Sequence, residues 1–133
     1  AGEELPSNVC AAIEDCGYTS VWDEFEEQLK RKFRLPSFPL LNIASYICDK
    51  QGGYDFKEAS AQKQVARCDI PMMFIHGDAD DFVPFEMLDK VYESASCEKL
   101  VIEGAGHAMS SSVAPELYWS EVEKFLDRHM NGQ

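Results

Sequence analysis

The sequence has few basic residues, no long apolar run and no closely spaced cysteine pair, and each absence excludes a class of protein. With 12 Lys and Arg against 24 Asp and Glu, the formal net charge is −12, which argues against a nucleic-acid or anionic-membrane partner. No apolar run approaches the roughly 20 residues that a membrane span needs, and the acidic, polar first residues do not resemble a signal peptide. We therefore expect a soluble, cytoplasmic domain.

The five cysteines are odd in number and contain no C-x-x-C pair, which favours reduced, mostly buried thiols over a disulfide framework. The three histidines do not fall at ligand spacings with the cysteines, so the sequence predicts no zinc site. These residues are Cys10, Cys16, Cys48, Cys68, Cys97, His76, His107 and His129.

Apolar segments that are typical of strands alternate with amphipathic helical segments along the chain. Strands are predicted over 8–13, 70–75 and 99–102, and helices over about 20–34, 39–50 and 59–66, from Pro84 and from Pro115. The strand over 70–75 is apolar throughout, which is typical of a strand buried on both faces, and Thr19 or Ser20 can cap the first helix. This alternation predicts an α/β fold with three parallel strands and right-handed crossovers. Three parallel strands leave two open edges, so we expect part of a larger sheet and association of chains through the uncovered edge.

Polar residues follow each predicted strand, where ligands bind in parallel α/β sheets. They are Asp15 after the first strand, Asp78 to Asp81 after the second, and His107 after the third. One helix and one strand separate Asp80 from His107, so the two loops can be neighbours, and a carboxylate beside an imidazole can fix its tautomer. Gly104 and Gly106 are expected to let the backbone bend so that the ring reaches inward.

Two of these loops resemble motifs of the α/β-hydrolase superfamily. The segment Phe74–Pro84 reads F-I-H-G-D-A-D-D-F-V-P and resembles the acid loop H-G-x-x-D-x-x-V-P, in which Asp80 matches the catalytic acid. Gly104–His107 resembles the G-x-G-H loop, in which His107 matches the general base. Ala12–Ser20 is similar to a segment that follows the nucleophile region in uncharacterised bacterial members, which belong with the esterase-like and prolyl-oligopeptidase-like branches.

The resemblance covers essentially the whole chain and implies the C-terminal portion of one α/β-hydrolase domain over residues 1–133. Residues 20–68 are longer than one crossover helix needs, and such an insertion often forms a lid in this family. Ala1–Pro6 resembles the end of the helix that follows the nucleophile. The family implies a small ester or amide substrate and no metal or organic cofactor.

The nucleophile motif of this family, G-x-S-x-G, is absent from the 133 residues. The family order is serine, acid, histidine, so the resemblance implies a serine upstream of Ala1. The parent protein is then a serine hydrolase, most simply an esterase, in which Asp80 orients His107 and His107 transfers the proton. The chain by itself is expected to be inactive, because losing one triad member removes most of the rate.

Several alternatives remain open at this stage. Asp81 competes with Asp80 as the acid, while Cys16 and the serines 110–112 are less favoured nucleophiles. His76 is interpreted as a packing residue or a backbone hydrogen-bond partner, and Asp78, Asp80 and Asp81 lack the glycine and distal glutamate of a calcium loop. A non-catalytic α/β interaction module or fold relic is the main rival, and another enzyme of the same fold with an upstream aspartate is the second.

Overall fold

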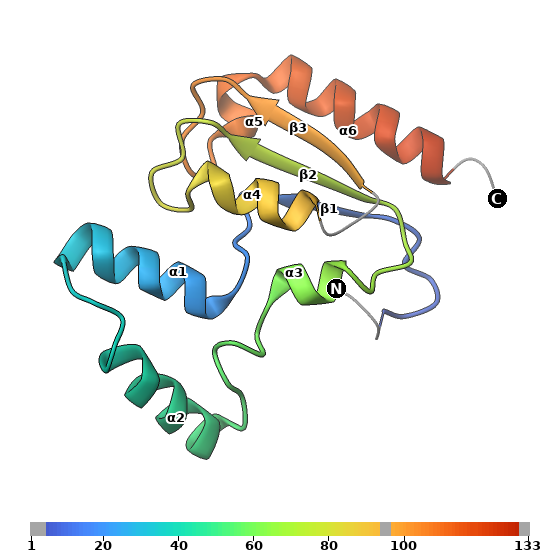
Figure 1. Cartoon of the computed structure of the whole chain (residues 1–133). Helices are drawn as coiled ribbons and strands as arrows, with labels where there is room; N and C mark the ends of the chain where they lie inside the picture. Colours follow the sequence, from blue (N-terminus) through green and yellow to red (C-terminus); the bar gives the residue numbers. More distant parts are fainter. Residues whose placement is uncertain (1–4, 94–96, 131–133) are drawn as a thin grey trace.

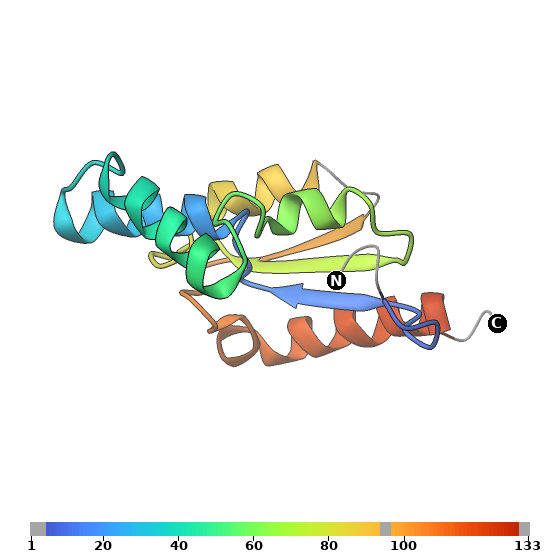
Figure 2. The same cartoon turned by 90° about the horizontal axis from the view of Figure 1, so that it is seen from below.

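The computed structural model describes residues 5–93 and 97–130, and in them one parallel sheet lies between two layers of helices (Figures 1 and 2). The elements in chain order are β1 (Ala12–Asp15), α1 (Val21–Gln28), the π-helical turn η1 (Leu29–Phe33), α2 (Leu40–Gly52), α3 (Ala61–Val65), β2 (Met72–Gly77), α4 (Phe85–Tyr92), β3 (Cys97–Ile102), α5 (Ser110–Val113) and α6 (Pro115–Met130).

The sheet has the order β1-β2-β3, and both pairs are parallel. The carboxyl ends of all three strands therefore lie at the same end of the sheet, as the predicted α/β architecture requires. The first strand begins later than predicted, because Val9 donates to the Pro6 carbonyl in a turn and the ladder begins where Ala12 donates to Pro71. Asp15 is consequently the last residue of β1 and not a turn residue.

The central strand β2 is buried on both faces, which confirms the interpretation of its apolar sequence. Met73 and Ile75 pack with Phe125 of α6 on one face of the sheet. Met72 and Phe74 pack on the other face, with residues of α3 and α4 that include Val65, Leu88 and Val91. The two clusters fix β2, and hence the loop that follows it, in the middle of the molecule.

The helices between β1 and β2 begin at a capped end. The Ser20 hydroxyl accepts the Asp23 N–H at 3.0 Å and starts α1, as the sequence suggested. The expected single helix to Arg34 instead changes to the π-helical turn η1 and ends where Arg34 adopts a left-handed φ of 55°. In Figures 1 and 2, α1 and α2 lie beyond the carboxyl ends of the strands, whereas α3 returns to the sheet. Whether α1 and α2 act as a lid stays a prediction.

The predicted likeness of Ala1–Pro6 to a helix end falls mostly outside the described residues. Among residues 5–93 and 97–130, no helix combines the length and apolarity needed to cross a membrane. The short helix α5 was not predicted from the sequence, and it follows directly after the His107 loop.

Candidate functional site

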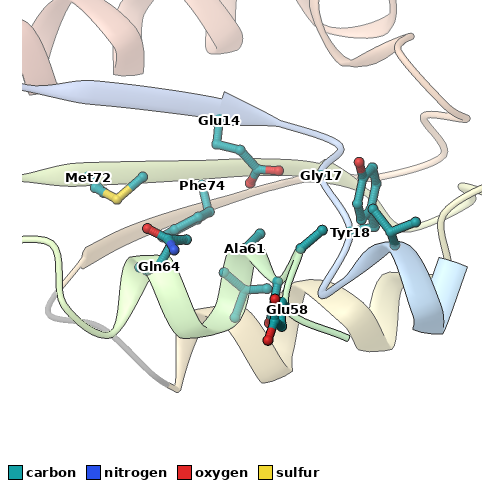
Figure 3. A pocket seen from close by; sticks show the side chains of 13 residues that line it. Glu14, Gly17, Tyr18, Glu58, Ala61, Gln64, Met72 and Phe74 are labelled. Carbon is teal, nitrogen blue, oxygen red and sulfur yellow. The ribbon is translucent and has the colours of Figure 1, made fainter. Parts of the chain in front are cut away.

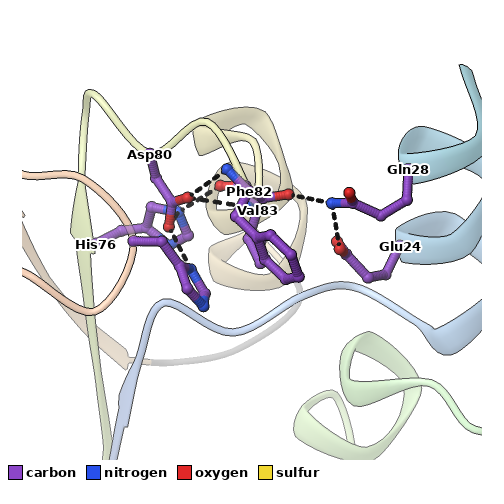
Figure 4. Close-up of polar contacts among 7 residues, drawn as sticks. Glu24, Gln28, His76, Asp80, Phe82 and Val83 are labelled. Carbon is purple, nitrogen blue, oxygen red and sulfur yellow. Dashed lines mark hydrogen bonds and ion pairs between the residues drawn. The ribbon is translucent and has the colours of Figure 1, made fainter. Parts of the chain in front are cut away.

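The loop after β2 is shaped by one carboxylate. Asp80 Oδ1 accepts the backbone N–H groups of Phe82 and Val83, each at 2.9 Å, and these bonds close the loop around the side chain (Figure 4). His76, fully buried at the end of β2, contributes Nε2 at 3.0 Å from the Val83 carbonyl and 3.4 Å from Asp80 Oδ2. The structure therefore gives His76 the backbone hydrogen bond expected from the sequence and holds Asp80 in one orientation.

The loop after β3 lies directly against the Asp80 loop. Asp78 Oδ1 accepts the Gly104 N–H at 2.6 Å, and Ala79 donates to the Ala105 carbonyl at 3.1 Å. Gly104 has a φ of 73°, so one of the two expected backbone bends is present, but Gly106 does not adopt a left-handed conformation. Gly77 is restricted by backbone atoms, since an added Cβ would lie 2.0 Å from the Ala105 carbonyl oxygen, and no sequence spacing indicated this close approach.

These two loops bring Asp80 and His107 into contact. His107 Nδ1 lies 2.9 Å from Asp80 Oδ2, with the Asp80 side chain fully buried and the His107 side chain 36% exposed. Because an ionised carboxylate can only accept, Nδ1 carries the hydrogen, and Nε2 of the neutral ring remains an acceptor. The Phe82 ring packs on the imidazole, with centroids 4.8 Å apart. A histidine held this way can take a proton at Nε2 from a group in front of it.

A cavity of about 420 Å³ opens beside His107, between the strand ends and α1. Its lining is largely apolar and includes Phe25, Phe82 and Val83. It is lined by Asp15, Cys16, Gly17, Tyr18, Glu24, Phe25, Gln28, Phe82, Val83 and His107. Such a pocket next to a proton-accepting nitrogen is suited to a small, mostly apolar ligand.

One hydrogen-bonded chain joins α1 to the Asp80 loop across this cavity. Gln28 Nε2 donates to the Phe82 carbonyl and to Glu24 Oε1, both at 2.7 Å (Figure 4). Burial raises the pKa of Glu24, and the Gln28 hydrogen bond opposes that rise. The helical insertion is therefore fixed to the loop that carries Asp80, a link that no sequence spacing indicated.

A second cavity of about 420 Å³ lies on the α3 side of β1 (Figure 3). Met72, Phe74 and Val65 contribute to its apolar lining, and Glu14 of β1 projects into it. Burial, followed by the charge of Asp15, raises the pKa of Glu14 to about 7, against a smaller opposing effect of the Gly17 N–H. Glu14 is not among the predicted site residues, because an acidic residue near the end of a short strand has no distinctive sequence pattern.

The remaining candidates take different places. Asp81 is exposed, Ser110 is buried, and His129 pairs with Glu98 at 3.2 Å. All five cysteines are thiols, and they are half-buried where we expected mostly buried ones. Cys16 lies at the site with Asp80 and His107. One ligand atom from each of these three residues falls within 4.8 Å of the other two.

Tyr118 of α6 contacts the end of β1 from the α6 side of the sheet, which is the face away from α3 and α4. Its hydroxyl donates to Asp15 Oδ2 at 3.1 Å, and burial together with the Asp15 charge raises the pKa of this phenol. Asp15 therefore has a partner on α6 and does not join the Asp80–His107 pair through a hydrogen bond.

Comparison with known proteins assigns this architecture. The chain is 32% identical over 129 residues to an uncharacterised protein of Bacillus subtilis, YqkD, covering 96% of the chain and 42% of that protein. It superposes on the Pyrococcus furiosus esterase Pf2001 with a TM-score of 0.64 at 22% identity, covering 93% of the chain and 47% of the esterase. No protein-family model matches the chain.

A Thermogutta terrifontis esterase, Est2, gives a TM-score of 0.63 at 22% identity over 94% of the chain and 46% of that protein. Esterase 2 of this organism is also solved phosphonylated by sarin, with a TM-score of 0.51 at 25% identity over 62% of the chain and 34% of that protein. The chain thus spans about half the length of the proteins that it resembles. Its three parallel strands and flanking helices form part of the α/β-hydrolase fold seen in these esterases.

Proposed function

We propose that this chain supplies the acid, Asp80, and the general base, His107, of a serine hydrolase that cleaves esters, with the nucleophilic serine contributed by a segment outside these 133 residues. The observation that carries the proposal is the 2.9 Å contact between Asp80 Oδ2 and His107 Nδ1 at the carboxyl ends of adjacent parallel strands. The likeness to esterase structures supports it.

In this mechanism His107 Nε2 accepts the proton of the serine hydroxyl while the serine oxygen attacks the ester carbonyl. The protonated ring then gives that proton to the departing alcohol, and a water molecule repeats the sequence to release the acid. Asp80 holds Nδ1–H and stabilises the imidazolium that forms at each step. Because Phe82 and Val83 fix the other oxygen of Asp80, the carboxylate is oriented before substrate arrives.

The cavity beside His107 is the place proposed for part of the substrate. Its volume of about 420 Å³ and apolar lining fit a small acyl or alkyl group better than a charged one. The helices α1 and α2 lie over the same end of the sheet (Figure 1), and we assign them the lid role. The hydrogen bonds of Gln28 would then couple the lid to the acid loop.

The proposal is tested by ester hydrolysis in a protein that contains this chain and its upstream partner segment. Replacing Asp80→Asn or His107→Ala should lower kcat by about 10⁴-fold, because the base loses its tautomer or is removed. The matched control is Asp81→Asn, which changes the neighbouring, exposed carboxylate and should leave kcat within a factor of about two. Equal activity in the Asp80 variant and the wild type would reject the assignment.

A covalent phosphonate probe tests the position of the nucleophile, since a related esterase is phosphonylated by sarin. The 133-residue chain alone should not be labelled, whereas the longer protein should be labelled on one serine upstream of Ala1. Labelling of the isolated chain, for instance at Ser110 or Cys16, would move the nucleophile into the chain. The absence of labelling and activity in both forms would favour a non-catalytic module.

We also propose that the isolated chain associates through the outer edge of β1, which pairs with no other strand among the described residues. Light scattering of the chain at rising concentration should show dimers or larger species. A sharp monomer at high concentration would contradict this expectation.

A further inference from the structure

Three loops that end three parallel strands bring together a sulfur, an oxygen and a nitrogen ligand. Cys16 follows β1, Asp80 follows β2 and His107 follows β3, and the ligand atoms all lie within 4.8 Å of one another. Thiolate, carboxylate and imidazole are the groups that bind Zn²⁺ in proteins, and three such ligands with an open fourth position are typical of accessible zinc sites. We propose that Cys16, Asp80 and His107 form a binding site for a zinc-like divalent cation. A cation bound there would bridge Asp80 and His107 and prevent His107 from transferring protons.

The distances require only a small adjustment. Ligand atoms at about 2.0–2.3 Å from a tetrahedral zinc ion lie roughly 3.3–3.8 Å from one another. The Asp80 Oδ2 and His107 Nδ1 atoms are 2.9 Å apart, so they have to separate by roughly 0.5 Å to admit the ion. No two of the three ligand atoms are more than 4.8 Å apart, so the sulfur of Cys16 has to approach by roughly 1 Å at most, which is within the range of a side-chain torsion change.

The surroundings hold each ligand in place. Asp80 uses Oδ1 for the N–H groups of Phe82 and Val83, which leaves Oδ2 for the ion. The Ala108 N–H hydrogen-bonds to Cys16, and the Cys16 N–H donates to the Ile75 carbonyl at 2.9 Å. Such outer hydrogen bonds orient metal ligands and are a regular part of zinc sites.

Binding has a defined proton balance. Burial raises the pKa of the Cys16 thiol, so the group is protonated at neutral pH. When the cation binds, the S–H proton of Cys16 is released to solvent and the thiolate sulfur binds the metal. His107 stays neutral but changes tautomer: the Nδ1 hydrogen is lost to solvent, Nε2 takes up a proton from solvent, and Nδ1 binds the metal. No oxidant or reductant takes part.

The site lies beside the cavity that we assign to substrate, because Cys16 and His107 both line it. Only the inhibitory consequence rests on the proposed hydrolase function; cation binding itself does not. In an active protein, zinc-like ions should therefore inhibit hydrolysis and compete with ligands in this cavity, whereas Mg²⁺ and Ca²⁺, which prefer oxygen ligands, should have little effect.

The test uses Co²⁺, a spectroscopic substitute for zinc, added to the 133-residue chain. The wild type should bind one ion and show a thiolate-to-cobalt absorption band. Cys16→Ser should lose the band, while the control Cys48→Ser, which changes a half-buried thiol of α2, should keep it. Asp80→Asn should weaken Co²⁺ binding by at least about tenfold, since second and third ligands each contribute to affinity.

A wild-type measurement keeps the test independent of whether the variants fold. Cadmium NMR of the chain should show one site with a single sulfur ligand and additional nitrogen and oxygen ligands. The absence of a thiolate band, a band that survives in Cys16→Ser, or a cadmium signal with only oxygen ligands would overturn the proposal. Because no ester enters these measurements, the cation site can fail while the hydrolase proposal stands, and the reverse.

Discussion

Two carboxylates near the carboxyl ends of neighbouring strands, the buried Asp80 and the half-buried Glu14, have different surroundings. Asp80 receives two backbone N–H groups on one oxygen and the nearby nitrogens of His76 and His107 on the other. Glu14, one strand away, projects into an apolar cavity and has the Gly17 N–H as its stabilising contact, so its pKa rises to about 7. The difference shows that the loop after β2 supplies hydrogen-bond donors for a charged carboxylate, whereas the apolar cavity on the α3 side of β1 supplies few.

The largest expected effect comes from removing the well-bonded carboxylate. Asp80→Ala leaves the N–H groups of Phe82 and Val83 and the ring of His107 without their acceptor, and should cost about 4 kcal/mol of unfolding free energy. Urea unfolding of the chain measures this. Asp81→Ala, which changes an exposed neighbour, should stay within about 0.5 kcal/mol of the wild type. A loss below about 1 kcal/mol for the Asp80 variant would show that these bonds do not shape the loop.

The second prediction removes the space that lets the two site loops meet. Gly77→Ala places a methyl group 2.0 Å from the Ala105 carbonyl oxygen, and because backbone atoms must shift, the expected cost is about 3 kcal/mol. The comparison variant is Gly106→Ala, whose new methyl meets nothing nearer than 4.0 Å, and which should cost under about 1 kcal/mol. Equal thermal stability of the two variants would contradict this account of the loop contact.

The third prediction sharpens the comparison at Glu14. The pKa of this group rises from 4.5 in the unfolded chain to about 7 in the fold, so the folded state binds the proton more tightly. The contribution of protonated Glu14 to the free energy of unfolding is fully present below about pH 4.5 and is lost as the pH rises through about 7. Glu14→Gln cannot ionise, so the variant should gain stability over the wild type across this window, by about 3 kcal/mol at pH 8.

Unfolding curves of the variant and the wild type at pH 4.5 and pH 8 measure that gain. The pH-dependent effects of the other carboxylates are the same in both proteins and cancel in the difference. Glu58→Gln is the control, since Glu58 borders the same cavity but is exposed, and this variant should stay within about 0.5 kcal/mol of the wild type. A Glu14→Gln variant that loses stability at pH 8 would mean that the charged form has a partner that stabilises it.

The smallest expected effect concerns the link between α1 and the Asp80 loop. Gln28→Ala removes the hydrogen bonds to the Phe82 carbonyl and to Glu24 and should cost about 1 kcal/mol. Glu27→Ala, one residue earlier, removes only a partly exposed contact of 3.8 Å with Arg31 and should cost about 0.3 kcal/mol. If hydrogen exchange in α1 is unchanged by Gln28→Ala, the helix is held by packing and not by this link.

Local patterns were sufficient where a single element decides the outcome. The apolar run before His76 predicted a strand buried on both faces, and β2 has that burial. Pro115 was placed correctly at the start of the last helix, and Ser20 is the cap of α1 among the two candidates, Thr19 and Ser20. The first strand was misplaced by several residues, because a turn from Pro6 to Val9 occupies its expected start and because the ladder begins where Ala12 donates to Pro71, which is distant in the sequence.

What the sequence by itself determined is the order of the three strands and the main helices, the α/β class and the position of Asp80 and His107 after successive strands. These follow from periodicity and from the rule that parallel strands place their ends at one edge. Only the tertiary structure decided that Cys16 joins this pair, that Gly77 must be small and that Glu14 meets an apolar cavity. Each of these depends on distances between segments far apart in the chain, which the spacing of residues along the sequence does not contain.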